Sequence, residues 1–443
     1  MVALHDAPTG WAVSRWTDNP YSRGGWSLVA VGGSDEHRRR LGEPVDGRLI
    51  LVGEATHATQ AGMTHGAFDE GRRAAAWCMA AGHRRVLVVG AGAAGLGAAR
   101  ALADAGVAVE VVEARDRIGG RIHTTELHRP GRAPMAVELG ANWLQQAGHN
   151  TLAPIAQALN LTLVDTDFSS PLDLAVDHLP LPLDAHTLGS ELRHRIAALG
   201  TQDDPATNDP SAAELAAVWM EHATPNPPSE IARFIDAEVF LDAGLELDQL
   251  SARYGVEPGV GVGDRWIRGG YRQVLDHLAD GIDVHLQWPV DRVEHHAGQV
   301  RVLGPHGSFE ADAAIVTVPV AVLNAGVIEF DPPLPASHRD ALAVLRPGSV
   351  EKVALAFTER WWPRSNGYLR IFGTNRFGSD GCLGGDVSEW LDITDTVGEP
   401  VIVGLFAGPW TDLMWRDRTD ADVAQAATAV LRSATAHVPT APP

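Results

Sequence analysis

The sequence predicts an α/β fold with more than one domain. An apolar, β-branched run at Val86–Val89 leads through a glycine-rich turn into an alanine-rich helical stretch, Ala93–Ala105. A second apolar run, Val107–Val112, follows it, so the three segments have the order of a βαβ unit. The chain has 443 residues, 45% of them hydrophobic. This length supports roughly two to three domain-sized cores.

The turn between the first strand and the helix has the pattern G-x-G-x-x-G. Gly90 allows a tight turn, Gly92 lets the backbone approach a pyrophosphate, and Gly95 lets helix and strand pack closely. The helix N-terminus, which includes Ala94, offers N–H groups and a positive dipole to phosphates. Glu113 ends the second apolar run, where it can accept hydrogen bonds from ribose hydroxyls. These features predict a Rossmann-like dinucleotide-binding domain.

Two further motifs extend this pattern. Ala114-Arg115-Asp116-Arg117-Ile118-Gly119-Gly120-Arg121 combines glycines that allow close backbone approach with arginines that can neutralise a diphosphate. Farther on lies Glu138-Leu139-Gly140-Ala141-Asn142-Trp143. Both segments resemble motifs of the flavin amine oxidase superfamily, which includes monoamine and polyamine oxidases. The resemblance implies a GR2-type FAD domain whose cofactor contacts include Ala114, Arg115, Gly120 and Arg121, and, along the flavin, Gly140, Ala141, Asn142 and Trp143.

The segment before this domain resembles the end of the same family's chain. Arg15–Ser27 (RWTDNPYSRGGWS), Leu51–Thr56 (LVGEAT) and Gly62–Gly71 (GMTHGAFDEG) are similar to motifs that close the chain in the family and wrap the isoalloxazine ring. Residues 417–443 form a helix pattern followed by HVPTAPP, which resembles the segment that precedes those motifs.

This order predicts a circular permutation. Joining Pro443 to Met1 would restore the usual order, with the break in a proline-rich surface loop, where chain cuts are best tolerated. The helix Gly66–Ala80 is expected to end at Gly82 and lead directly into the first strand of the βαβ unit. A gene fusion with an N-terminal remnant is the alternative. It would require a second copy of the closing motifs near residue 443, and the sequence has none there.

Lys352 is the only lysine in the chain. An ammonium on a flexible stem can change its pKa when it is buried, whereas arginine stays charged. Lys352 lies in an alternating strand pattern, Ser349–Phe357, which is followed by Trp361 and Trp362. By resemblance it occupies the place of a lysine bonded through water to flavin N5, and is a catalytic candidate that would assist the reaction of reduced flavin with oxygen.

The resemblance assigns further roles around the flavin. Trp26 matches one wall of a substrate cage, and Met63 falls at the other wall, where it offers polarizable bulk without an aromatic face. Gly25 stands where monoamine oxidases have the cysteine that bonds flavin, so the FAD is expected to be non-covalent. The other expected cofactor contacts are Trp16 with the ring, Gly53 and Glu54 with the ribityl–diphosphate, Thr64 with the flavin C2 carbonyl, and Val290 with the adenine.

Two domains are expected. Residues 1–145 and 263–330 would form the FAD-binding domain, in which 1–83 are equivalent to the usual C-terminal segment. Residues 146–262 and 331–443 would form a mixed α+β substrate-binding domain, with helices through most of 150–262.

Composition excludes several classes of function. A net charge of −21 argues against nucleic acid or an anionic membrane surface as partner. No apolar run approaches the roughly 20 residues that cross a bilayer, and no secretory signal is evident. The two cysteines form neither a metal motif nor a disulfide framework. We therefore expect a cytoplasmic protein without a metal, and a homo-oligomer is compatible with these features.

The sequence thus predicts an FAD-dependent amine oxidase that converts a small amine to an imine by hydride transfer to flavin N5 and reduces O2 to H2O2. An FAD-dependent desaturase of an apolar metabolite is an alternative, which would need an apolar tunnel and no lysine at position 352. An L-amino-acid oxidase is another, but it would place an arginine within Gly140–Trp143. A demethylase would need an inserted tower or reader domain, for which the chain has no length.

Overall fold

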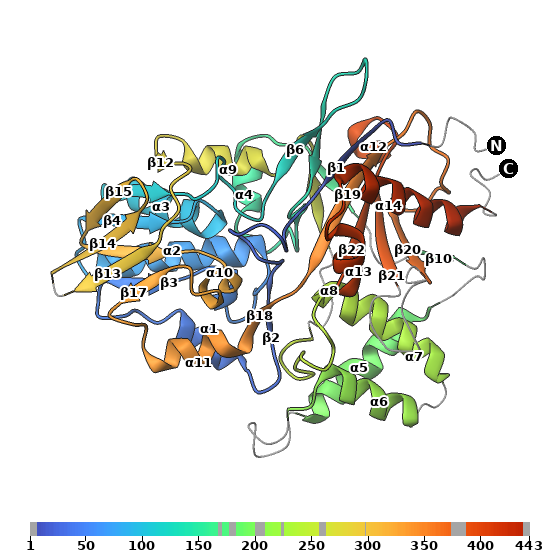
Figure 1. The fold of residues 1–443 in the computed structure, drawn as a ribbon, viewed down its shortest axis with the longest axis horizontal. Helices are drawn as coiled ribbons and strands as arrows, with labels where there is room; N and C mark the ends of the chain where they lie inside the picture. Colours follow the sequence, from blue (N-terminus) through green and yellow to red (C-terminus); the bar gives the residue numbers. More distant parts are fainter. Residues whose placement is uncertain are drawn as a thin grey trace.

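The computed structural model has two lobes, one around a parallel sheet and one around a mixed sheet (Figure 1). A group of helices lies beside the mixed sheet. The structure describes residues 7–166, 171–176, 183–199, 209–222, 226–256, 263–296, 298–373 and 387–436. The ends that would be joined by reversing the permutation, 437–443 and 1–6, lie outside these ranges. Within the described residues, none of the helices combines the length and apolar character needed to cross a membrane.

The parallel sheet contains the predicted βαβ unit. Its five strands are ordered β12 (Asp283–His285), β5 (Ala108–Val112), β4 (Arg85–Val89), β16 (Ala313–Val316) and β3 (Leu49–Leu51), and all neighbours run parallel. The strands β4, β16 and β3 bury their side chains on both faces, apart from Arg85 at the start of β4, as parallel sheets do. The helices α2 (Thr64–Ala80), α3 (Ala93–Asp104) and α9 (Arg272–Ala279) pack against one face. The expected helix Gly66–Ala80 thus begins two residues early, at Thr64.

The other face of this sheet is covered by smaller elements. A four-stranded sheet has the order β15 (Gly307–Ala311), β14 (Gln299–Gly304), β13 (Arg292–His296) and β17 (Glu329–Asp331). Beside it lie α1 (Asp35–Leu41), α10 (Val320–Asn324), α11 (Ala336–Val344) and the pair β2 (Ser27–Val29) and β18 (Leu345–Pro347).

The mixed sheet has six strands. Their order is β1 (Gly10–Val13), β19 (Val350–Ala356), β22 (Val401–Ala407), β21 (Val387–Asp392), β20 (Tyr368–Phe372) and β10 (Leu172–Ala175). The helices α13 (Pro409–Trp415) and α14 (Asp420–Thr435) cover one face, and α12 (Thr394–Val397) precedes β22. Every residue of β19 is buried, so the alternation expected for this strand corresponds to two covered faces rather than to one face in water.

The remaining elements connect the two lobes. The helices α5 (Ala185–Leu199), α6 (Ala212–Glu221), α7 (Pro228–Ile235) and α8 (Leu241–Ala243) form their own apolar core, with a π-helical turn, Asp236–Phe240, between the last two. A hairpin of β6 (Thr124–Leu127) and β7 (Met135–Glu138), a small sheet of β8 (Trp143–Leu144), β11 (Arg265–Ile267) and β9 (Leu163–Asp165), and α4 (Ala153–Ala158) complete the fold. The expectation of helices through 150–262 is incomplete, because β9 and β10 pair there with distant strands.

The first segment of the chain contributes to both lobes. In Figure 1, β1 lies beside β19, and β3 lies in the parallel sheet. The two described ends of the chain also meet: Arg15 forms an ion pair with Asp420 at 2.7 Å, and Trp415 Nε1 donates to the Ser14 carbonyl at 2.9 Å. These contacts hold segments some 400 residues apart in sequence against one another.

Candidate functional site

A single cavity of about 940 Å³ extends from the glycine-rich turn to Lys352. Every candidate residue from the sequence, apart from Gly95, lines this cavity. These residues are Trp16, Trp26, Gly53, Glu54, Met63, Thr64, Gly90, Gly92, Ala94, Glu113, Ala114, Arg115, Gly120, Arg121, Gly140, Ala141, Asn142, Trp143, Val290 and Lys352. Segments from the two ends of the chain and from both lobes therefore meet at one site.

The three glycines of the turn have different surroundings. Gly90 has a φ of +104°, a conformation that side chains rarely adopt. A Cβ on Gly95 would lie 1.8 Å from the Gly90 carbonyl oxygen, whereas the nearest atom to a Cβ on Gly92 would be 3.9 Å away. Gly95 thus permits close packing of helix on strand, and Gly92 leaves space open at the cavity wall for a ligand.

Glu113 fastens this turn to the end of β5. Its carboxylate accepts hydrogen bonds from the Ala91 N–H at 2.8 Å and the Arg115 N–H at 2.9 Å. Each carboxylate oxygen has a second lone pair, so the residue can still accept a hydroxyl from a ligand in the cavity.

Positive charge is concentrated beside the turn. Burial lowers the pKa of Arg115, and repulsion from Arg121 lowers it further. Burial, with repulsion from Arg115, lowers the pKa of Arg117 to about 10. Burial, together with repulsion from Arg117 and Arg115, lowers the pKa of His123 to about 4. The arginines at 115, 117 and 121 stay charged, and three cations next to a helix N-terminus and an open glycine backbone fit the diphosphate of FAD.

Glu54 lines the cavity, and protein groups hold its carboxylate in place. Its carboxylate accepts hydrogen bonds from Ser27 Oγ at 2.6 Å, Arg121 at 2.9 Å and the Gly62 N–H at 3.0 Å. Burial alone would raise the pKa of Glu54, but Arg121, Ser27 and Arg38 bring it below its ordinary value. The residue therefore holds three segments together at the cavity wall.

The N-terminal end of α2 is anchored by buried polar contacts. Thr64 Oγ1, at the first residue of the helix, lies 2.8 Å from the Tyr271 hydroxyl. The Tyr271 N–H donates to Glu138 at 2.6 Å, and Thr124 Oγ1 donates to the same carboxylate at 2.7 Å. Burial raises the pKa of Glu138 to about 7. Nearby, Trp16 Nε1 donates to the Leu139 carbonyl at 2.8 Å, which fixes the indole against the 138–143 segment.

Lys352 extends from β19 toward this same segment. Its Nζ donates to the Gly140 carbonyl at 2.6 Å and to Asn142 Oδ1, and it lies 5.7 Å from the centre of the Trp143 ring. Burial lowers its pKa to about 8, although Glu138 and Glu389 oppose the change. Lys352 is 8% exposed. The sole lysine is thus buried at the cavity wall, with a pKa closer to neutral pH than that of an exposed lysine.

Three polar residues at this end of the cavity were not identified from the sequence. Glu238, Tyr368 and Glu389 all line it. Glu238 comes from the π-helical turn, and the other two come from β20 and β21. The segment Val387–Asp392 (VSEWLD) does not alternate apolar and polar residues, and no local motif connects that strand with Lys352.

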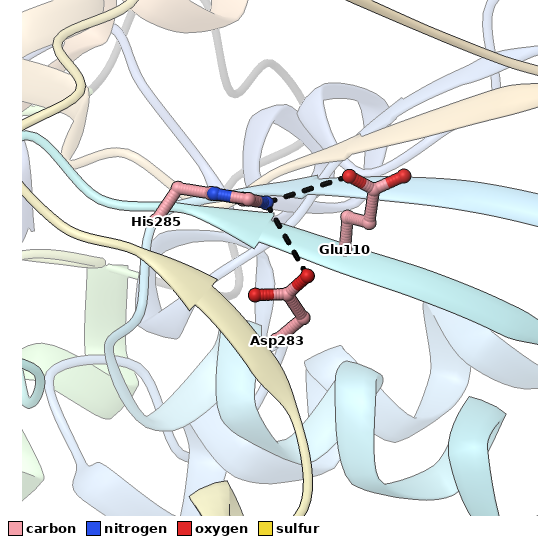
Figure 2. A group of neighbouring side chains, drawn as sticks. All are labelled: Glu110, Asp283 and His285. Carbon is pink, nitrogen blue, oxygen red and sulfur yellow. Dashed lines mark ion pairs between the residues drawn. The ribbon is translucent and has the colours of Figure 1, made fainter.

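In the part of the chain that the structure describes, one group has the composition of a metal site, and it lies away from the cavity lining. Figure 2 shows His285 between Glu110 and Asp283 at the edge of the parallel sheet. His285 Nε2 lies 3.4 Å from Glu110 and 3.7 Å from Asp283, and Arg85 also pairs with Glu110, at 2.8 Å. These contacts are those of an ion-pair cluster that fastens β12 to β5.

The fold and the cavity define a flavin-binding oxidoreductase, and comparison with known proteins identifies its family. The model of the family "Flavin containing amine oxidoreductase" matches residues 2–79 and 93–442. The chain belongs to this family, and it is an FAD-dependent amine oxidase.

Curated relatives include plant polyamine oxidases. The chain is 31% identical over 349 residues to polyamine oxidase 3 of Oryza sativa subsp. japonica, with 73% of this chain and 67% of the relative covered. It is 29% identical over 355 residues to polyamine oxidase 2 of Arabidopsis thaliana, covering 75% and 70%.

Solved structures give the same fold. Cyclohexylamine oxidase from Brevibacterium oxydans IH-35A matches with a TM-score of 0.60 and 25% identity, over 80% of this chain and 81% of that one. A putrescine oxidase bound to putrescine matches with a TM-score of 0.59 and 22% identity, over the same shares.

Proposed function

We propose that this protein oxidises a small-molecule amine at the Lys352 end of the cavity, with O2 as the electron acceptor. The observation that carries the proposal is the continuity of one cavity from a diphosphate-type site at Gly92 and Arg115 to a buried lysine of lowered pKa. Groups with perturbed pKa values in a cleft are typical of catalytic sites. The name of the family and those of its members support an amine as the substrate.

In this proposal, FAD is bound non-covalently. The residues that would hold FAD are the glycine-rich turn, Glu113, Arg115 and Arg121, together with the backbone of Gly140–Trp143. When bound, FAD supplies the redox chemistry, in which a hydride from the substrate α-carbon is accepted at N5 and the electrons pass to O2 to give H2O2. Gly25, which lines the cavity without a nucleophilic side chain, supports non-covalent attachment.

The protein residues position groups and move protons. Lys352 Nζ is positioned by its hydrogen bonds to the Gly140 and Asn142 oxygens. There the ammonium can donate a proton and the neutral amine can accept one. Trp26 and Met63 would shape the space around the reacting carbon. Thr64, at the start of α2, would turn helix N–H groups toward the flavin, where the helix dipole favours negative charge.

We also propose that the chain is a circular permutant. Three observations support this order. The family model matches in two blocks, β3 lies in the parallel sheet, and the two described chain ends contact each other. A domain division at 1–145 with 263–330 and 146–262 with 331–443 is part of the same proposal. A gene that begins at Arg84 and joins Pro443 to Met1 should give a folded, yellow protein, and a protein that cannot fold in this order would argue against the permutation.

For the location, we propose the cytoplasm, on the basis of the two cysteines and the acidic composition. A homo-oligomer is compatible with this proposal, and native mass determination would measure its size.

The experiment for the activity begins with the purified protein. Acid precipitation should release FAD into the supernatant, and a peroxide-coupled screen of mono-, di- and polyamines, aryl amines and amino acids should give amine-dependent H2O2. Flavin that stays with the denatured chain would contradict non-covalent binding. A flavin-loaded protein that no amine reduces would contradict the proposed reaction.

A further inference from the structure

A second cavity, of about 590 Å³, lies against the flavin cavity. Parts of the segments 13–21, 114–117 and 287–289 form it, together with His123 and with His306 in the turn between β14 and β15. The residues that line both cavities include Trp16, Tyr21, Ala114, Arg115 and Pro289. These residues form a wall that the two cavities share.

Aromatic contacts hold this shared wall. The indole of Trp16 packs edge to face against the ring of His123, with 6.1 Å between the ring centres. The guanidinium of Arg115 lies over the Trp16 ring, 5.5 Å from its centre. Arg115 is 8% exposed, so its charge acts on the two cavities more than on open solvent.

Two guanidiniums at the second cavity have neutral hydrogen-bond partners. Arg117 donates to three backbone carbonyls at 3.0 to 3.1 Å. Arg115 donates to one carbonyl and to Asn19 Oδ1, each at 3.1 Å. Glu113 and Asp116 attract both arginines, but in the described parts of the chain no carboxylate forms an ion pair with either of them. A cation that loses water without gaining an anion is destabilised, so an anion in this cavity would stabilise both.

The charges around the second cavity leave it positive. Arg117 lines this cavity but not the flavin cavity, so the FAD diphosphate would act on it only from a distance. Arg15 is already paired with Asp420, at 2.7 Å. Asp116 is the only carboxylate among the described residues that line the cavity, and His123, with a pKa of about 4, is neutral at neutral pH. This positive site stands out in a chain whose net charge is −21.

We propose that the second cavity binds a small molecule that carries a phosphate monoester, with Arg115 and Arg117 as the cations that hold its phosphate. Guanidinium groups match phosphate oxygens in geometry and in charge. The cavity is larger than inorganic phosphate requires, and Val13, Trp16 and Pro289 offer apolar surface to an organic group. This inference does not depend on the proposed amine oxidation.

Arg115 couples this site to the flavin site, because one guanidinium borders both cavities. A phosphate in the second cavity would compete with the FAD diphosphate for this charge and would repel it. Each ligand should therefore weaken the binding of the other, and by the same factor, since binding linkage is reciprocal. An abundant phosphate ester would thereby lower the flavin content of the protein.

Calorimetric titration of the flavin-loaded protein in chloride buffer of fixed ionic strength tests the site. Inorganic phosphate, glycerol 3-phosphate and AMP share the phosphate but differ in the attached group, and glycerol and adenosine are controls without it. We expect at least one of the two esters to bind with a Kd of about 1 mM or below. That ester should bind more tightly than inorganic phosphate because it also covers the apolar surface, and the two controls should not bind.

Single substitutions assign the binding to this cavity. Arg117→Gln should raise the Kd of the bound ester by about tenfold or more, and Arg117→Lys, which keeps the charge, should restore part of the affinity. Gln287→Glu places a carboxylate at an exposed lining position and should raise the Kd by about threefold or more through repulsion. Gln299→Glu is the matched control, since Gln299 is also exposed but lies outside the lining, and it should leave the Kd unchanged.

Equilibrium dialysis of FAD measures the coupling between the two sites. With the ester at a saturating concentration, the Kd of FAD should be about two- to tenfold higher than in chloride at the same ionic strength. Arg117→Gln should remove this difference, because the ester no longer occupies its site.

Several results would overturn the proposal. Absence of binding for all three phosphates excludes the site, and inorganic phosphate that binds as tightly as both esters excludes a monoester as its ligand. Equal weakening by Gln287→Glu and Gln299→Glu would trace the effect to the charge of the whole chain. Should Arg117→Gln fail to fold, Arg117→Lys and Gln287→Glu still decide, since an unchanged Kd in both places the ester elsewhere. A Kd of FAD that the bound ester leaves unchanged excludes the coupling through Arg115.

Discussion

The two ends of the cavity are built from different parts of the polypeptide. At the glycine-rich turn, the wall is mostly backbone: Gly92 leaves space, Gly95 lets α3 approach β4, and Glu113 ties the turn to β5. At the Lys352 end, the wall is formed by side chains from distant strands and a π-helical turn. Backbone geometry serves an invariant diphosphate, whereas side chains can be exchanged to select a substrate. Substitutions at the two ends should therefore have separable effects.

The largest effect is expected from Gly95→Ala. The new Cβ would lie 1.8 Å from the Gly90 carbonyl, a contact that only a backbone shift can relieve, so the unfolding free energy should fall by more than about 3 kcal/mol and the flavin should be lost. Gly148→Ala is the matched control, because no atom lies within 4 Å of its Cβ. Thermal unfolding and the flavin-to-protein ratio measure both. Full flavin content in Gly95→Ala would contradict this account, because it would show that the turn accommodates the added methyl group.

Lys352→Met should keep the fold and the flavin but slow turnover. A positioned proton-transfer group commonly contributes about 10²–10⁴-fold, and methionine fills a similar volume without the amine. Stopped-flow absorbance can follow flavin reduction by amine and reoxidation by O2 separately. We expect at least one rate to fall by more than tenfold, with reoxidation the more affected. Wild-type rates in both half-reactions would make Lys352 an ordinary strand residue.

Arg115→Ala should weaken FAD binding without changing the preference among amines. Loss of one charged donor beside the diphosphate should raise the dissociation constant of FAD by about 10- to 100-fold. Equilibrium dialysis of the flavin measures this constant, and the ratio of kcat/KM values for two amines at saturating FAD provides the internal control. A changed ratio with unchanged FAD affinity would place Arg115 at the wrong end of the cavity.

The effect on stability per pH unit is the smallest of these changes. The pKa of Lys352 is lowered by burial from 10.5 to about 8, so between these values the unfolded chain binds more protons than the folded one. The free energy of unfolding should therefore rise with pH from about 8 to 10.5, by at most about 1.4 kcal/mol per pH unit. Below pH 8, the destabilisation caused by the buried ammonium should be constant. The difference between wild type and Lys352→Met across this range isolates the contribution. A pH-independent difference would mean that the ammonium is not desolvated.

The sequence predicts the first end of the cavity more completely than the second, for a physical reason. Gly90, Gly92, Gly95 and Glu113 act through local geometry, which leaves a pattern of fixed spacing. Lys352 was detectable because it is the only lysine. The place of Glu389 in the cavity wall depends on the strand order that brings β21 next to β22, and sheet pairing over such distances has no local signature.

Glu54 illustrates the same limit at a residue that the sequence did identify. Its place at the cavity followed from its motif, but its bonds to Ser27, Arg121 and Gly62 depend on tertiary contacts. The missed strands within 150–262 are similar: β10 is a short edge strand defined by its pairing with β20, not by its own composition.

The central claim is that one cavity joins a flavin site to an amine site, and anaerobic reduction of the bound flavin tests it most directly. The flavin-loaded protein, mixed with an amine substrate without oxygen, should lose its visible flavin absorbance. Admission of air should restore that absorbance and release H2O2 equimolar with the flavin. An absorbance that no amine diminishes, in a protein that carries its full complement of FAD, would contradict the account.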